Sequence, residues 1–132
     1  MRGNHVLWLI VALAGCGGAY STDPPAPPPP PPPGDGTPSA MANVAMTKTG
    51  DGYGGDVNAF NPSAVTITRS GTVTWTNNSG LVHNVTFGTV TGAPSNVPDL
   101  ASGSASRTFT TAGTFAYQCT NHPGMTGSVV VQ

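Results

Sequence analysis

The stretch Tyr117-Gln118-Cys119-Thr120-Asn121-His122-Pro123-Gly124-Met125 places a thiol, an imidazole and a thioether between two apolar runs. Its Pro and Gly predict a turn. The residues before it, 114–118, and after it, 128–132, are rich in strand-forming side chains and predict strands. A further histidine, His83, precedes another such run. We therefore expect side chains from two separate segments to meet at one end of a β-structure.

These side chains match copper better than other metals. A thiolate from Cys119 and neutral imidazoles from His83 and His122 would form a trigonal plane. Met125 would add a weak axial thioether, as in blue-copper sites. Each residue alone has a plainer interpretation, since a single His or Met is usually a surface or core residue and a single Cys is usually a buried thiol. Together, at this spacing, the four favour one type 1 copper ion.

The numbers of cysteines and histidines limit the kinds of site that this chain can form. With two cysteines in the chain, Cys119 has no internal disulfide partner if Cys16 is modified. Cys119 then pairs between molecules, is buried and inert, or binds a metal, and its neighbours favour the metal. His5 leaves with the N-terminal segment, so two histidines remain. Two are too few for a multicopper oxidase or most catalytic zinc sites, and no nucleophile elbow supports a hydrolase.

The N-terminal residues predict export. Arg2 and the apolar run 6–14 have the composition of a signal peptide, and Leu13-Ala14-Gly15-Cys16 resembles a bacterial lipoprotein signal, in which the Cys is lipidated. An ordinary cleavable signal with an incidental Cys is the alternative. We expect a lipoprotein signal peptide over residues 1–15 and lipidation of Cys16.

A proline-rich segment follows the predicted signal peptide. Pro27 to Pro33 is an unbroken proline run, which predicts an extended spacer before a Gly-containing hinge. We therefore expect a lipid-anchored linker over residues 16–39 and one domain over residues 40–132. The spacer either gives the domain reach from a membrane or only connects the two parts.

The exported chain carries little charge. With Arg2 removed, three basic residues remain against five aspartates, which gives a net charge of −2. The absence of a basic patch argues against nucleic acid as a partner. Docking of another protein should then depend on apolar contact, and its rate should respond weakly to salt.

Short runs rich in Val, Thr, Ile and Phe predict an all-β sandwich, and no helical periodicity competes with them. We expect strands at residues 43–48, 58–60, 64–68, 72–77, 83–87, 104–110, 114–118 and 128–132. Hairpin turns are predicted at 69–71 and 111–113, and a long surface loop between Gly88 and Gly103. The expected core contains Phe60, Val65, Ile67, Val73, Trp75, Val85, Phe87, Phe109, Phe115, Val129 and Val131.

Several of these pieces together resemble the cupredoxins, the small type 1 blue-copper proteins that include plastocyanin, pseudoazurin and amicyanin. The resemblance spans nearly all of residues 40–132, and its motifs are Phe60-Asn61-Pro62, residues 65–77, His83-Asn84-Val85 and Gly113 to Met125. The short Cys-x-x-His-x-x-Met spacing is most similar to that of amicyanin. The resemblance implies a cupredoxin-like Greek-key β-sandwich of about eight strands. It also implies that one copper ion is bound by His83, Cys119, His122 and Met125.

The resemblance implies roles for neighbouring residues as well. Asn84 and Thr120 lie at positions that in cupredoxins hydrogen-bond to each other and connect the two ligand segments. Pro123 has no N–H to donate to the thiolate, which should slightly lower the reduction potential. The electron is expected to leave through the edge of His122, inside an apolar patch formed by Leu81, Val82, Pro94, Pro123 and Gly124.

The resemblance therefore predicts a type 1 blue-copper electron carrier that cycles between Cu(II) and Cu(I) and is not an enzyme. We expect a lipid-anchored monomer in the periplasm or cell envelope that docks redox proteins at the His122 patch. Two other functions remain open. One is a protein that holds or delivers copper without redox work, with Met41 and Met46 as spare thioethers. The other is a metal-free surface interaction domain, which the presence of all four ligand residues disfavours.

Overall fold

The computed structural model describes residues 37–50, 52 and 55–132 of the chain. The predicted signal peptide, the predicted lipidation site Cys16 and the proline run lie outside the described residues. Within the described part there is no helix long and apolar enough to cross a membrane.

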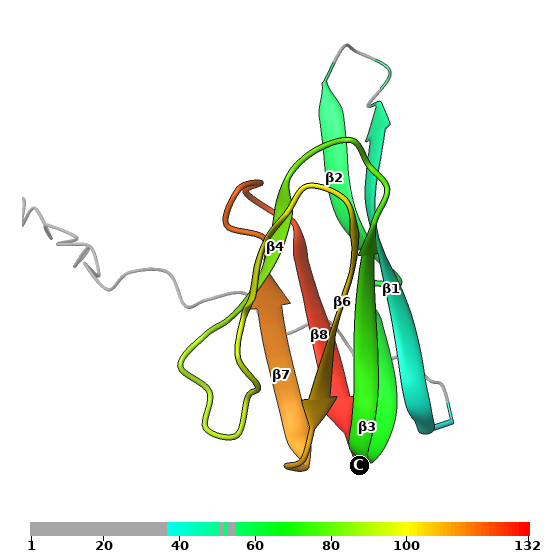
Figure 1. Ribbon diagram of the computed structural model, residues 1–132, viewed down its shortest axis with the longest axis vertical. Coiled ribbons are helices and arrows are strands. Elements are labelled where there is room, and N and C mark those ends of the chain that lie inside the picture. Colours follow the sequence, from blue (N-terminus) through cyan, green and yellow to red (C-terminus); the bar gives the residue numbers. More distant parts are fainter. Residues whose placement is uncertain (1–36, 51, 53–54) are drawn as a thin grey trace, which may run out of the picture.

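The described residues form strands joined by turns and loops, without a helix, as the sequence predicted (Figure 1). Every predicted run overlaps an observed strand, and runs 64–68 and 72–77 belong to one continuous strand. The strands are β1 (Ser39–Gly50), β2 (Asp56–Asn61), β3 (Ala64–Asn77), β4 (His83–Phe87), β5 (Val97–Leu100), β6 (Gly103–Phe109), β7 (Gly113–Gln118) and β8 (Thr126–Val131).

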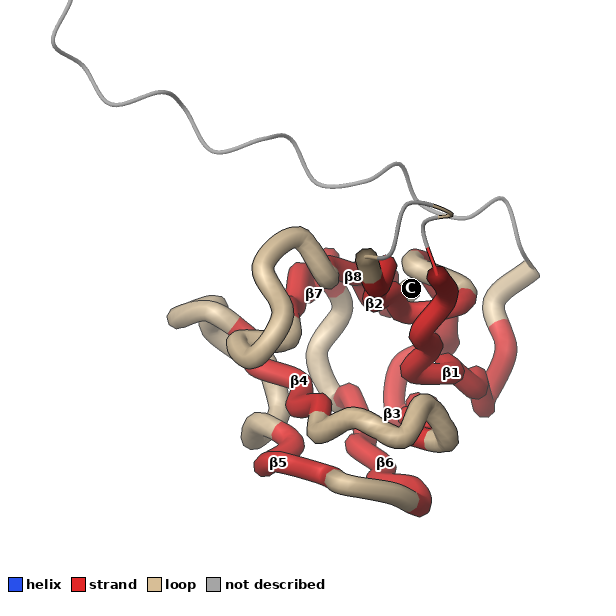
Figure 2. The backbone as a smooth tube through the Cα atoms, turned by 90° about the horizontal axis from the view of Figure 1, so that it is seen from above, coloured by secondary structure: helices blue, strands red, loops and turns tan. Residues whose placement is uncertain are grey.

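The strands form a sandwich of two layers that share β3. The first part of β3, Ala64 to Ile67, runs parallel to β8, and that layer continues through β7 to β4 and β5. The second part, Gly71 to Asn77, lies between the parallel strand β1 and the antiparallel strand β6, and β2 pairs with β1. Seen from above, the strands form a ring (Figure 2), and the buried apolar side chains form one cluster. The predicted β-sandwich is confirmed.

The predicted hairpin at residues 69–71 is wrong. The chain does not reverse there, because β3 continues through a bulge in which Ser70 has φ of 63°. The last residue of the chain keeps this segment paired. The N–H of Arg69 donates to the carbonyl of Gln132 (2.8 Å), and the N–H of Gln132 donates to the carbonyl of Ile67 (3.0 Å). The bulge carries β3 from one layer to the other.

The predicted hairpin at residues 111–113 is also wrong. This turn connects β6 with β7, but β6 pairs with β3, and β7 pairs with β4 and β8. The turn therefore crosses between the layers. A turn sequence does not determine which strands pair, since pairing depends on the apolar face that each strand presents to the core.

Strand β5 lies in segment 88–103, which was predicted to be a surface loop. It pairs with β4, and its Leu100 stands opposite His83. Val97 is buried and anchors the strand in the core. The sequence pattern did not predict this strand because it contains Pro98. Proline usually indicates the end of a strand, although an edge strand tolerates it.

Every predicted core residue is buried. The centre of the core is an aromatic cluster in which the rings of Trp75 and Tyr117 meet edge to face, with centroids 5.4 Å apart. Phe60 packs against the same tyrosine at 4.8 Å. Tyr117 was not predicted, although it occupies the inward position two residues before Cys119. Burial raises the pKa of Tyr117 to about 12.

Three strand ends meet at one end of the sandwich. β4 begins with His83, β7 ends just before Cys119, and β8 begins just after Met125. Because β4 and β8 both run antiparallel to β7, the start of β4, the end of β7 and the start of β8 lie at the same end of the layer. The loop of residues 119–125 therefore lies beside the start of β4 (Figure 1).

The backbone at Gly127 has no space for a side chain, because the ring of Tyr117 lies over it. A Cβ atom at this position would lie 2.7 Å from Cε2 of Tyr117 and closer still to its Cζ and hydroxyl oxygen. We expect Gly127→Ala to lower the free energy of unfolding by about 1–3 kcal/mol, as overpacking does. Chemical denaturation of the two proteins measures this difference.

Gly88→Ala is the matched control, since a Cβ atom at Gly88 would meet nothing within 4 Å. This substitution should leave the free energy of unfolding within about 0.5 kcal/mol of the wild-type value. Equal losses of stability in the two variants would contradict the proposed packing of Tyr117 on Gly127.

Candidate metal centre

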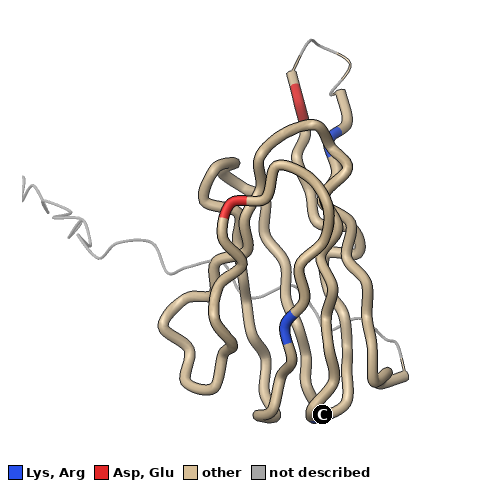
Figure 3. Tube along the Cα trace, viewed as in Figure 1, with Lys and Arg blue, Asp and Glu red and all other residues tan. Residues whose placement is uncertain are grey.

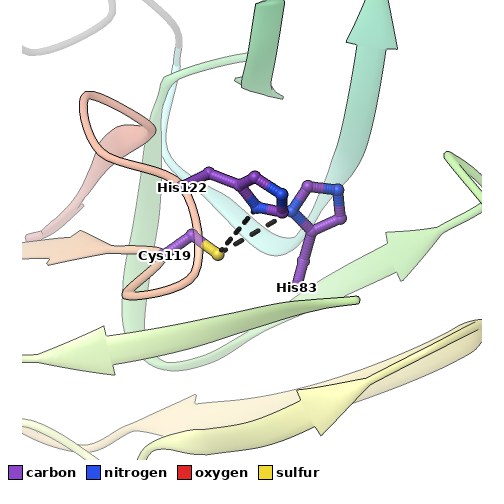
Figure 4. Close-up of side chains that lie close together, drawn as sticks. All are labelled: His83, Cys119 and His122. Carbon is purple, nitrogen blue, oxygen red and sulfur yellow. Dashed lines mark hydrogen bonds between the residues drawn. The ribbon is translucent and has the colours of Figure 1, made fainter. Parts of the chain in front are cut away.

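The side chains of His83, Cys119 and His122 converge at this end of the sandwich (Figure 4). The Sγ of Cys119 lies 3.7 Å from Nδ1 of His83 and 3.6 Å from Nδ1 of His122. The potential ligand atoms of the three residues all lie within 4.8 Å of one another. Both imidazoles therefore point their Nδ1 atom toward the thiol of Cys119.

His83 lies deep in the protein. Its side chain is completely buried, and its Nε2 lies 2.9 Å from the hydroxyl of Ser79. Burial, together with the nearby His122, lowers the pKa of His83 below its usual range. The imidazole is therefore neutral at pH 7, which is the form that binds metals.

The loop from Cys119 to Met125 is closed by its own backbone. The N–H of Cys119 donates to the carbonyl of Met125 (2.9 Å), and the N–H of Met125 donates to the carbonyl of His122 (3.1 Å). Gly124 has φ of 87°, a conformation that a side chain would strain. Met125 is almost fully buried, so its thioether belongs to the interior of the protein.

Asn84 connects the two segments that carry these side chains. Its Oδ1 accepts the backbone N–H of Thr120 (2.9 Å), and its Nδ2 donates to the hydroxyl of Thr120 (2.8 Å). The backbone N–H of Asn84 also points at Sγ of Cys119 from 3.5 Å. Asn84 therefore fixes the loop against β4 and offers the sulfur a donor that would stabilise a thiolate.

Asp99 of β5 extends this connection and was not predicted. Its Oδ1 accepts from Nδ2 of Asn84 (2.9 Å) and from Nδ2 of Asn121 (3.0 Å). These two hydrogen bonds lower the pKa of Asp99. The sequence contains no signal for this role, because an aspartate in a Pro- and Gly-rich segment is also typical of a solvated loop.

His122 is the residue of this group that reaches the surface. It is half-buried, whereas His83 and Cys119 are buried. Nearby, Val82 is 42% exposed, and its carbonyl lies 3.4 Å from Nδ2 of Asn121 in the loop. A shallow hollow at this end is lined by Asp56, Val57, Asn58, His122, Pro123 and Gly124.

Pro94 does not belong to this surface, contrary to the prediction. It lies in the loop after β4, a strand that runs away from the site (Figure 1). The neighbouring Gly92 approaches Thr111, which lies in the turn between β6 and β7 at the opposite end. Of the predicted patch, Pro123 and Gly124 line the hollow beside His122 together with Val57 of β2, and Val82 lies next to Asn121 of the same loop.

The described part of the chain carries few charged residues (Figure 3), and three of them, Lys48, Asp56 and Asp99, lie at the end that holds the site. Lys48 and Asp56 form an ion pair of 3.1 Å across the β1–β2 hairpin. The carboxylate of Asp99 is engaged by two side-chain amides. A molecule that contacts this end would therefore meet mostly apolar and neutral groups.

The sequence matches a family model described as copper binding proteins, plastocyanin/azurin family, over residues 45–132. The chain is 40% identical over 102 residues to the chloroplastic plastocyanin of Tetradesmus obliquus, and the match covers 69% of each chain. It is 47% identical over 64 residues to the amicyanin of Paracoccus denitrificans, which covers 46% of this chain and 49% of that protein.

Solved structures of similar proteins share the fold. A purple cupredoxin from Nitrosopumilus maritimus superimposes with a TM-score of 0.57 at 28% identity, over 69% of this chain and 99% of that chain. A reduced Cu(I) form of an amicyanin variant superimposes with a TM-score of 0.57 at 31% identity, over 71% and 90%. The copper-containing nitrite reductase of Thermus scotoductus SA-01 matches at 27% identity and a TM-score of 0.57, over 73% of this chain but only 22% of that chain.

The residues present fit a copper ion. A thiol and two imidazole nitrogens face one another from buried or half-buried positions, and the second nitrogen of His83 already has a partner. Soft sulfur and imidazole donors suit copper and disfavour magnesium or calcium, which take oxygen ligands. With the thioether of the buried Met125 at the end of the same loop, the site is suited to one type 1 copper ion.

Asp99 should make the stability of the protein depend on pH in the acid range. Its folded-state pKa is lowered from 3.8 by the hydrogen bonds from Asn84 and Asn121. The ionised carboxylate therefore contributes stability that is complete above the ordinary pKa and is lost as pH falls through the lowered one. Asp99→Asn keeps an acceptor oxygen but cannot titrate. The part of the acid-induced decrease in stability that comes from Asp99 should therefore be absent in this variant.

The measurement is urea denaturation of metal-free wild type and Asp99→Asn at a series of pH values. Both proteins contain the same histidines and the same other aspartates, so the difference between their unfolding free energies reports Asp99. If the difference between the unfolding free energies of wild type and Asp99→Asn stayed constant from neutral to strongly acid pH, the prediction would be contradicted.

Proposed function

Because the chain belongs to the copper-binding proteins of the plastocyanin/azurin family, we propose that it is a one-electron carrier with a single type 1 copper ion. The proposed ligands are His83, Cys119, His122 and Met125. The observation that carries the proposal is the thiol of Cys119 with the Nδ1 atoms of both histidines 3.6 and 3.7 Å away. This combination, with a thioether on the same loop, is the donor set of electron-transfer copper sites.

Hydrogen bonds within the protein hold these donors in place. Asn84 makes two hydrogen bonds to Thr120, and the backbone of Cys119 closes the loop on Met125. A copper ion bound here would supply a Cu(II)/Cu(I) couple. Donors that are fixed by their surroundings move little when the charge changes, which keeps the reorganisation energy small and favours rapid transfer.

Burial of the proposed ligands favours electron transfer over catalysis. His83, Cys119 and Met125 are buried, and His122 is half-buried. A catalytic metal site keeps an open coordination position that substrate or water can reach. Here the imidazole edge of His122 is the part of the site nearest the surface, so we propose that the electron enters and leaves there.

Redox proteins are the proposed partners, and they would dock on the patch of Leu81, Val82, Pro123, Gly124 and Val57 around His122. Val57 is 49% exposed and Val82 is 42% exposed. With few charges nearby, apolar contact rather than steering would bring the two proteins together. The low positive charge of the chain also disfavours nucleic acid as a partner.

The proposed place of action is outside the cytoplasm, in the periplasm or cell envelope. Leu13-Ala14-Gly15-Cys16 supports a lipoprotein signal over residues 1–15, with lipidation of Cys16. Residues 16–39 would then form the tether and residues 40–132 the copper domain, which we propose to be a monomer. The proline run from Pro27 to Pro33 would hold the domain away from the membrane.

Protein loaded with Cu(II) should have an intense visible absorption band from charge transfer between thiolate and copper. Cys119→Ser should abolish this band, because a hydroxyl does not replace the thiolate, and should leave the domain folded. Absorption and circular dichroism spectra check the two expectations. Met41→Leu is the matched control, since it removes a thioether that is 69% exposed on β1 and should leave the band unchanged.

The Cu(II) absorption spectrum also tests the two alternative functions and the assignment of the site. A colourless or weakly absorbing copper complex of the wild type would favour a protein that holds or delivers copper without redox work. Failure to bind Cu(II) would favour a metal-free interaction domain. A Cys119→Ser variant with the wild-type spectrum would show that the proposed site is wrong.

Electron self-exchange between the Cu(I) and Cu(II) forms should depend on the surface at Val82 and respond weakly to salt. Val82→Asp would place like charges face to face in the encounter complex. We expect it to lower the self-exchange rate at low ionic strength by about tenfold. Line broadening in NMR spectra of mixtures of the two forms measures this rate.

Val90→Asp is the matched control. Val82 and Val90 are both 42% exposed, but Val90 lies in the loop after β4, at the opposite end from the site. The same added charge should change the rate there by less than about twofold. A steep salt dependence of the wild-type rate, or equal slowing in both variants, would argue against docking at the His122 patch.

A further inference from the structure

The turn between β3 and β4 contains a hydrogen-bonded group that lies behind His83. Asn77 ends β3, Ser79 lies in the turn, and His83 begins β4. The Oγ of Ser79 lies 2.9 Å from Nε2 of His83 and 2.8 Å from Oδ1 of Asn77. Asn77 and His83 are both completely buried. The group therefore contacts the ring nitrogen of His83 that faces away from Cys119.

The orientation of the Asn77 amide is fixed by its surroundings. Its Nδ2 donates to the carbonyls of Leu81 (2.8 Å) and Leu100 (2.6 Å). Its Oδ1 accepts the backbone N–H of Ser79 (3.0 Å). Reversing the amide would set its oxygen against two carbonyls and its NH₂ group against an N–H, which is costly for a buried group. Oδ1 of Asn77 therefore faces Ser79.

The direction of the hydrogen bond to His83 follows from the Ser79 hydroxyl. A hydroxyl has one proton to donate and two lone pairs to accept with. The proton goes to Oδ1 of Asn77, an atom that only accepts, and the N–H of Leu81 donates to the Ser79 oxygen at 3.1 Å. One lone pair remains, and it faces Nε2 of His83. The proton on the imidazole is therefore on Nε2.

We propose that Asn77 and Ser79 are positioning residues that hold His83 as its Nε2–H tautomer, with the lone pair of Nδ1 aimed at the copper position beside Cys119. In the opposite tautomer, Ser79 would have to turn its proton to Nε2 and give up its bond to Asn77. That exchange costs one hydrogen bond inside the protein. A partner on the second nitrogen fixes both the tautomer and the ring orientation of a metal-binding histidine. The inference rests on the proposed role of His83 as a ligand.

His122 provides an internal reference for this inference. Among the described residues, the hydrogen-bond contact of its ring is with Sγ of Cys119. Its ring is half-buried and lies on the loop rather than on the turn that contains Ser79. The two rings are in contact, with centroids 4.5 Å apart. A change in the turn should therefore act directly on Nε2 of His83, and it should reach His122 only through that ring and change its signals less.

Long-range proton–nitrogen NMR spectra of the metal-free protein, at a pH where both imidazoles are neutral, report the tautomer of each ring. In the wild type we expect His83 as Nε2–H, with a proton that exchanges slowly with water. Ser79→Ala should lower the ratio of Nε2–H to Nδ1–H by about three- to tenfold, and should speed the exchange of that proton. Ser79→Thr keeps the hydroxyl and should restore the wild-type signals.

Asn78→Ala is the matched control, because it changes an exposed residue of the same turn and should leave the His83 signals unchanged. A folded Ser79→Ala protein with the wild-type tautomer and proton exchange would overturn the proposal, and would limit Ser79 to support of the turn. If Ser79→Ala does not fold, the wild-type spectrum still decides, since His83 in the Nδ1–H form would overturn the proposal. No copper is present in this experiment, so its failure is distinct from failure of the proposed electron transfer, which the Cu(II) spectrum tests.

Discussion

The side-chain amide of Asn84 determines how closely the two segments of the site approach each other. It accepts from and donates to Thr120, and it also donates to Asp99. Three segments that are distant in the chain, β4, β5 and the loop of residues 119–125, are therefore joined at one buried residue. Without this bridge, the loop would keep its own two backbone hydrogen bonds and the contacts of Asn121 with Asp99 and Val82. The position of the Cys119 sulfur would then be less defined.

The two proposed imidazole ligands have different environments, and each environment suits a different task. His83 is completely buried and has the half-buried Ser79 and the completely buried Asn77 behind it, so its ring is constrained by hydrogen bonds inside the protein. His122 lies between Cys119 and the surface, next to exposed apolar residues. One histidine thus anchors the site to the sandwich, and the other connects it to whatever contacts this end of the protein.

Strand positions and inward-facing residues could be predicted because both depend on alternation between neighbouring residues. Trp75, Phe109 and Val129 are examples, and all are completely buried. Strand pairing could not be predicted in the same way. Gly-containing turns at 69–71 and 111–113 indicated hairpins, whereas the first is a bulge in β3 and the second crosses between layers. Pairing depends on contacts between residues far apart in the chain, and turn sequences do not encode these contacts.

The chemical character of the site follows from the sequence, because Cys119, His122 and Met125 lie within one short loop and bring a thiol, an imidazole and a thioether with them. The convergence of His83 on Cys119 within 3.7 Å was decided by the tertiary structure, through the antiparallel pairing of β4 with β7. The contacts of Asp99 and Ser79 were decided there too. Ser and Asp are common in any turn or loop, and they acquire a role only when folding places a specific donor or acceptor within hydrogen-bond distance.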